Sequence, residues 1–95
     1  MRLLKKEIEI VKSVILGLIP DAEVYIFGSK IYDIAKGGDI DILVISENEI
    51  PVENILTIKV LLKENLGDQK IDLVCQKADN LSPFAELIKM EGVHI

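Results

Sequence analysis

Two aspartates separated by one residue, Asp39 and Asp41, are the side chains in this sequence that most directly suggest chemistry. They stand in residues 39–45, where alternating polar and apolar residues followed by an apolar run predict a β-strand. Because alternate residues of a strand point to the same side, both carboxylates would share one face, and Ile40 and Ile42 would take the other. Neighbouring carboxylates repel each other. A divalent cation relieves that repulsion, and Mg²⁺ suits the pair because it prefers oxygen ligands.

A third acid repeats this pattern. Asp72 interrupts the apolar run of residues 70–76, which predicts another strand. If that strand lies beside residues 39–45, Asp72 completes a cluster of three carboxylates. Such a cluster can hold two metal ions about 3.5–4 Å apart for phosphoryl or nucleotidyl transfer. The alternatives are a solvated acid pair after a glycine turn, and for Asp72 an exposed place on an edge strand.

Gly28 and Ser29 supply a second set of groups. They follow the strand predicted for residues 23–27 and precede a short helix predicted for residues 30–35. A glycine lets a ligand approach the backbone, and the amides at a helix start attract an anion. Together with the Ser29 hydroxyl and Lys30, they would hold the phosphates of a nucleotide. The simpler interpretations are a helix N-cap for Ser29 and a surface position for Lys30.

The elements that must position these residues follow from apolar spacing and from turn residues. The predicted order is helix 2–19, strand 23–27, short helix 30–35, strand 39–45, helix 51–66, strand 70–76 and helix 83–91. Ser82 and Pro83 are a strong signal for the start of the last helix. This order predicts an α+β domain of two layers, with a sheet of about three strands. Both long helices would cover one face and leave the other open to a ligand or a partner.

Length and composition limit the classes of function. The chain has 95 residues, 49% of them hydrophobic, with a mean hydropathy of +0.35 and no apolar run of the ~18 residues that a membrane helix needs. We therefore expect one cytoplasmic domain over residues 1–95. The net charge of −5 argues against autonomous nucleic-acid binding. Cys75 is expected in the core on the strand face opposite Asp72, and His94 in a frayed tail.

The spacing of these residues resembles that of the nucleotidyltransferase superfamily of the DNA polymerase beta type. The resemblance rests on Gly28-Ser29, nine intervening residues, Asp39-Ile40-Asp41 and the later Asp72. The length and the element order are similar to those of the minimal nucleotidyltransferases, the MNT proteins. The resemblance spans residues 8–92 and implies a two-layer α/β nucleotidyltransferase core with a small mixed sheet.

The resemblance also implies the substrate, the cofactor and the roles of the residues. ATP would be the nucleotide, and two Mg²⁺ ions would bind to Asp39, Asp41 and Asp72, with Asp72 also assisting deprotonation of the attacking hydroxyl. The nucleotide phosphates would be held by Gly28, Ser29 and Lys30. This sequence departs from the family where Lys30 replaces a common arginine, because lysine keeps the charge and loses the bidentate fork.

Minimal members are often encoded beside a HEPN-domain protein and act as antitoxins that transfer AMP to a tyrosine of that toxin. The resemblance therefore implies a HEPN protein as acceptor, and a chain this short has no second domain for a complex acceptor. Two alternatives stay open. One is a binding module that neutralises a HEPN partner by occlusion without catalysis, and the other is an enzyme that modifies a hydroxyl of a small molecule. An oligomer surface on the apolar stripe of residues 2–19 also stays open.

Overall fold

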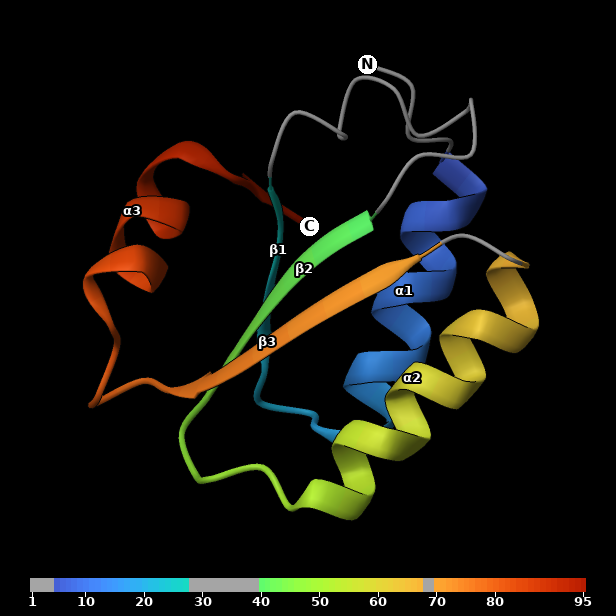
Figure 1. The fold of residues 1–95 in the computed structure, drawn as a ribbon, viewed down its shortest axis with the longest axis horizontal. Helices are drawn as coiled ribbons and strands as arrows, with labels where there is room; N and C mark the ends of the chain where they lie inside the picture. Colours follow the sequence, from blue (N-terminus) through green and yellow to red (C-terminus); the bar gives the residue numbers. More distant parts are fainter. Residues whose placement is uncertain (1–4, 28–39, 68–69) are drawn as a thin grey trace.

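The computed structural model describes residues 5–27, 40–67 and 70–95, and these residues form three helices and four strands (Figure 1). In chain order the elements are α1 (Lys5–Leu18), β1 (Glu23–Phe27), β2 (Ile40–Ser46), α2 (Val52–Leu66), β3 (Ile71–Lys77), α3 (Pro83–Glu91) and β4 (Val93–His94). Every predicted boundary on the described residues agrees within one residue. The short helix predicted for residues 30–35 lies outside the described residues. No helix in the described ranges is long and apolar enough to cross a membrane.

The four strands form one mixed sheet in the order β3-β2-β1-β4. β2 and β3 are parallel neighbours, and α2 connects them (Figure 1). β1 pairs antiparallel with β2 on one side and with β4 on the other. The predicted sheet of about three strands is therefore present, with the short β4 added at one edge.

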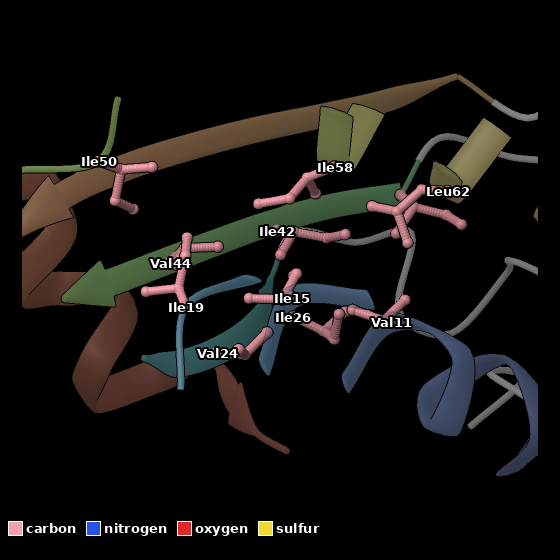
Figure 2. Packing of buried hydrophobic residues seen from close by; sticks show 11 residues of the cluster. Val11, Ile15, Ile19, Val24, Ile26, Ile42, Val44, Ile50, Ile58 and Leu62 are labelled. Carbon is pink, nitrogen blue, oxygen red and sulfur yellow. The ribbon is translucent and has the colours of Figure 1, made fainter. Parts of the chain in front are cut away.

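The main core lies between the sheet and the two long helices, which pack on the same face as predicted. Each helix turns an apolar stripe toward the strands, so that buried side chains from α1, α2, β1 and β2 meet in one cluster (Figure 2). Its fully buried members include Val11 and Ile15 of α1, Ile58 and Leu62 of α2, and Ile42 and Val44 of β2. Burial of each such side chain contributes about 1.5–3 kcal/mol. The α1 stripe is thus a core surface.

The opposite face of the sheet, which was predicted to be open, is partly covered by α3, so that prediction is wrong for the part of the face that Ala85 and Ile88 cover. Ala85 and Ile88 pack there against Tyr25, Leu43 and Ile45, which alternate with the residues of the main core. The two central strands, β1 and β2, therefore each contribute to two apolar clusters, one on either side of the sheet.

A hydrogen-bond network fixes the start of α3 beside the end of β3. The Ser82 hydroxyl accepts a hydrogen bond from the Ala85 amide at 3.1 Å, as the predicted N-cap requires. The Gln76 side chain donates to the Ser82 hydroxyl at 3.0 Å and accepts from the Ser82 amide at 2.8 Å. α3 is thereby attached at the end of β3 that is farther from Asp72.

The C-terminal residues form β4, so the expected frayed tail around His94 is wrong. His94 pairs with Tyr25 in the sheet, and the two rings stack with centroids 4.8 Å apart and an interplanar angle of 23°. The Ile95 amide also donates to the carbonyl oxygen of Val24 at 3.0 Å. Backbone pairing and the ring contact together stabilise β4. A strand of two residues is too short to produce a recognisable pattern in the sequence.

Gly92 makes the close approach of β4 to β1 possible. A Cβ atom at this position would lie 2.8 Å from the carbonyl oxygen of Ile88 and 3.1 Å from that of Ile26. Backbone atoms on both sides leave no room for a larger residue without displacement of the chain. The glycine therefore allows α3 to end and β4 to begin against the sheet within one residue.

Candidate functional site

Asp41 and Asp72 are direct neighbours in the sheet. They are register partners in the parallel pairing of β2 with β3. Paired residues of adjacent strands point to the same side, and neighbouring strands lie about 4.8 Å apart. The predicted juxtaposition of the third-strand acid with the Asp-x-Asp strand is therefore confirmed for Asp41.

The two carboxylates lie on the face that bears α3. Along β2, Ile40, Ile42 and Val44 belong to the main core between the sheet and the long helices, whereas Leu43 belongs to the α3 cluster. Asp41 alternates with the core residues and so shares the side of Leu43. Its side chain is half-buried. The chain thus places its strand acids opposite the fully apolar face.

The local sequence explains why the two acids meet. Each acid is the second residue of its strand and is flanked by apolar residues, as Ile-Asp-Ile in β2 and Ile-Asp-Leu in β3. The Ile40 amide donates to the carbonyl oxygen of Lys70 at 2.8 Å, which aligns the starts of the two strands. In a parallel pair with aligned starts, second residues stand side by side. The pairing register therefore converts two similar sequence motifs into one acidic site.

Access to the site is greatest at β3. Asp72 is exposed, because β3 is at one edge of the sheet and α3 is anchored at the far end of this strand. A ligand approaching from solvent can therefore reach the Asp72 carboxylate without displacing a described side chain. The exposure agrees with the alternative interpretation of Asp72 as an exposed residue of an edge strand. The register adds a second carboxylate, that of Asp41, on the neighbouring strand.

An aromatic pair borders the site on the other side. Phe27 is the register partner of Asp41 in β1, and its ring meets that of Phe84 edge-on at 5.5 Å and 81°. Phe84 is 50% exposed at the start of α3. The sequence analysis did not select Phe84. Aromatic residues make up only 4% of the chain, and this scarcity was a signal that could have drawn attention to it. Phe27, Asp41 and Asp72 thus form a row across three strands.

Four of the six predicted site residues lie outside the described residues. They are Gly28, Ser29, Lys30 and Asp39. The described residues on either side of them, Phe27 and Ile40, are both at the sheet end that carries Asp41. The phosphate-holding role and the first carboxylate of the triad therefore stay predictions.

Cys75 occupies the place that the strand alternation predicts. It packs against the main core, on the face of β3 opposite Asp72. Burial raises the pKa of the Cys75 thiol to about 11, although the charge of Lys59 acts in the opposite direction. The thiol is therefore a protonated core group, and it takes no part in the acidic site.

The comparison with known families assigns the fold and its general chemistry. Residues 22–95 match the family described as Polymerase beta, Nucleotidyltransferase. The chain belongs to this family. No curated protein matches the chain. The matched region contains all four strands and all six predicted site residues, whereas α1 precedes it. The superfamily resemblance is confirmed, and nucleotidyl transfer is the class of reaction that membership supports.

The donor chemistry of the acid pair fits Mg²⁺. Asp41 and Asp72 offer carboxylate oxygens from adjacent strands, and Mg²⁺ commonly binds through one or two carboxylates together with substrate phosphates. Among the described residues, no three His, Cys, Asp or Glu side chains gather as a metal site. The predicted third ligand, Asp39, is outside those residues. Two of the three proposed ligands are therefore placed together in the sheet.

Proposed function

We propose that the protein is a Mg²⁺-dependent nucleotidyltransferase that moves AMP from ATP to a hydroxyl group of a partner protein. The observation that carries the proposal is the in-register pair of Asp41 and Asp72 on the accessible face of the sheet. Family membership over residues 22–95 supports the nucleotide as substrate. The proposed enzyme is a single minimal nucleotidyltransferase domain over residues 1–95 that acts in the cytoplasm.

Each site residue has a defined part in the proposed reaction. Asp41 and Asp72, together with Asp39, would hold the metal, which supplies charge neutralisation and orientation of the phosphates when bound. The amides at Gly28 and Ser29 would hold the β- and γ-phosphates. The acceptor oxygen attacks the α-phosphorus, the bond to pyrophosphate breaks, and the hydroxyl proton passes to Asp72. The products are an AMP ester and pyrophosphate.

The proposed acceptor is a tyrosine of a HEPN-domain protein, with this chain as its antitoxin. The support is the resemblance of the Gly28-Ser29 and Asp39-x-Asp41 spacing to the minimal nucleotidyltransferases. The exposure of Asp72 agrees with an acceptor that arrives on the surface of another protein.

The test is transfer of label from α-³²P-ATP to the protein encoded by the neighbouring gene. We expect Mg²⁺-dependent labelling with the wild type and labelling slower by about 10²-fold or more with Asp41→Asn or Asp72→Asn. Asp79→Asn is the matched control, because Asp79 is an exposed aspartate in the turn after β3 and pairs with Lys77 at 3.8 Å. Labelling at the wild-type rate in both site variants would refute the assignment of the site.

Metal binding can be measured without turnover. Mn²⁺, used in place of Mg²⁺, should broaden the amide resonances of β2 and β3 around Asp41 and Asp72 and leave those near Asp79 sharp. We expect Asp72→Asn to weaken this broadening, because one carboxylate ligand is lost. Broadening that is centred elsewhere would separate the metal site from the acid pair.

A second candidate function is a binding module that silences its partner by occlusion. The observation in its favour is an apolar stripe on α3, formed by Phe84, Leu87 and Met90 at 50%, 48% and 83% exposure. Residues three apart lie on one side of a helix, so the stripe suits the apolar face of a partner helix. Tight complex formation and silencing without any labelled product would favour this function over transfer.

A further inference from the structure

Phe84 is an exposed aromatic side chain that the proposed reaction does not use. It stands in the first turn of α3, and half of the residue is open to solvent. Among the described phenylalanine and tyrosine residues, Tyr25 is buried and Phe27 is half-buried, so Phe84 is the most exposed. Single exposed apolar residues are common on soluble proteins. The significance of Phe84 therefore depends on what lies beside it.

The ring of Phe84 lies on the same face of the sheet as the acid pair. Phe27 is the register partner of Asp41, so the side chains of these two residues point to the same side. The rings of Phe84 and Phe27 then meet with centroids 5.5 Å apart. Because adjacent strands are about 4.8 Å apart, the Phe84 ring lies on the order of 10 Å from Asp41.

The contact between the two rings leaves part of Phe84 available to a ligand. The planes meet at 81°, and in such an edge-on pair the rings do not cover each other face to face. The residues that follow Phe84 hold it in place, because Ala85 and Ile88 are buried against the sheet and the Ser82 cap fixes the first turn of α3. A flat group can therefore stack on a ring whose position is already set.

The side chains across this face form a row with an acidic end and an aromatic end. Asp72 and Asp41 stand at one end, and Phe27 and then Phe84 follow. Figure 1 shows α3 beyond β1, across the sheet from the start of β3. A nucleotide is divided in the same way, since its phosphates bind the metal and its base is flat and uncharged. The ribose and the α-phosphate separate the two by a length of the same order as the row.

We propose that Phe84 binds the base of the nucleotide by stacking, while the acid pair holds the metal and the phosphates. This contact rests on the proposed nucleotidyl transfer, because it adds one binding residue to that site. The acceptor hydroxyl meets Asp72 at the exposed edge strand, so the base takes the opposite end of the row. Every base has a π-face, and the ring of Phe84 therefore holds the base without selecting among the four.

Leu87 distinguishes a stacked base from a docked partner helix. It stands three residues after Phe84 on α3 and is exposed to nearly the same degree, 48% against 50%. A partner helix laid along α3 would cover both side chains. A stacked base needs the ring of Phe84 alone, so Leu87→Ala is the matched control.

The test is calorimetric measurement of the affinity for α,β-methylene-ATP, an analogue that cannot transfer AMP, in the presence of Mg²⁺. Phe84→Ala should weaken binding about tenfold or more, because base–aromatic stacking is lost. Phe84→Leu should also weaken it, since leucine keeps an apolar contact with Phe27 and has no π-face. Phe84→Tyr and Leu87→Ala should both bind as the wild type does. Equal weakening in Leu87→Ala and Phe84→Ala would overturn the stacking of a base on this ring.

Inorganic tripolyphosphate separates the remaining outcomes, because it offers the phosphates without a base. Its affinity should be the same for the wild type and Phe84→Ala. An equal loss for both ligands in Phe84→Ala would give the ring a structural role and overturn the base contact. Unchanged affinity of Phe84→Ala for the nucleotide analogue would overturn it too and leave the proposed function standing. Binding of neither ligand by the wild type would refute the nucleotide site and the stacking contact together.

Discussion

The two faces of the sheet differ in composition although the same strands build both. Toward α1 and α2, β2 presents Ile40, Ile42 and Val44, all fully buried. Toward α3, the same strand presents Leu43 and, two residues nearer its start, the half-buried Asp41. One face is continuous and apolar, whereas the other changes along its length from apolar to acidic.

This difference separates the residues that maintain the fold from those that carry the proposed chemistry. Alternation along a strand assigns successive residues to opposite faces. A carboxylate can therefore stand next to core residues in the chain without entering the core. Substitutions at neighbouring residues of β2 and β3 should accordingly affect either activity or stability, and seldom both.

The largest effect should come from the acidic face. Asp72→Asn should lower the rate of nucleotidyl transfer about 10²–10⁴-fold, because it removes a metal ligand and the proposed base. The free energy of unfolding should change by no more than about 0.5 kcal/mol, since the side chain is exposed. Transfer assays and urea unfolding check the two expectations. A large loss of stability would show that Asp72 also supports the fold and would contradict the proposed division between the two faces of the sheet.

The reverse pattern is expected on the core face. Ile42→Ala should lower the free energy of unfolding by about 2–5 kcal/mol, because it opens a cavity in the fully buried cluster of Figure 2. Ile42→Val provides the graded control, with a loss of about 0.5–1.5 kcal/mol. Metal binding by the folded fraction should persist. A greater effect on Mn²⁺ affinity than on urea unfolding would contradict the division between the faces.

A smaller effect tests the anchor of α3. Ser82→Ala should lower the free energy of unfolding by about 1 kcal/mol, because the Ala85 amide and the Gln76 side chain lose their partner. Gln76→Ala should have an effect that is not additive with it, since both substitutions break one network. Additive losses in urea unfolding would mean that the two residues act independently.

The last prediction is limited to alkaline pH and concerns the Cys75 thiol. Because burial raises the pKa of this thiol from its usual 9.0 to about 11, the folded chain keeps the proton at a pH where the unfolded chain loses it. The resulting stability is fully present below pH 9 and is lost as the pH rises to 11. Cys75→Ala should remove this part of the alkaline loss of stability. Equal rates of alkylation by iodoacetamide at pH 9 in the folded and unfolded chains would contradict the raised pKa.

The sequence predicted most of the architecture because each long element carries a strong local signal. The three- and four-residue spacing of α1 places Val11 and Ile15 in the core. The Ser82-Pro83 start of α3 is also local, since the cap bond spans three residues. The position of Asp72 on the face opposite Cys75 follows from strand alternation alone.

The features that the sequence did not reveal depend on contacts between distant segments. The register of β2 with β3 depends on backbone pairing between segments that are far apart in the chain, so the sequence could suggest that Asp41 and Asp72 meet but could not establish their pairing. β4 has two residues, and its stability comes from pairing with β1 and from the stacking of His94 on Tyr25. The contact of Phe84 with Phe27 likewise joins residues from separate elements.

The short β4 has a consequence for assembly. It occupies one margin of the sheet with two residues, too few to direct the addition of another strand, while the opposite margin is formed by the full length of β3. With respect to strand pairing, the described part of the chain is therefore monovalent. If two such open margins paired, neither would be left for a third chain, so strand pairing at β3 could join two chains and could not extend into a fibre.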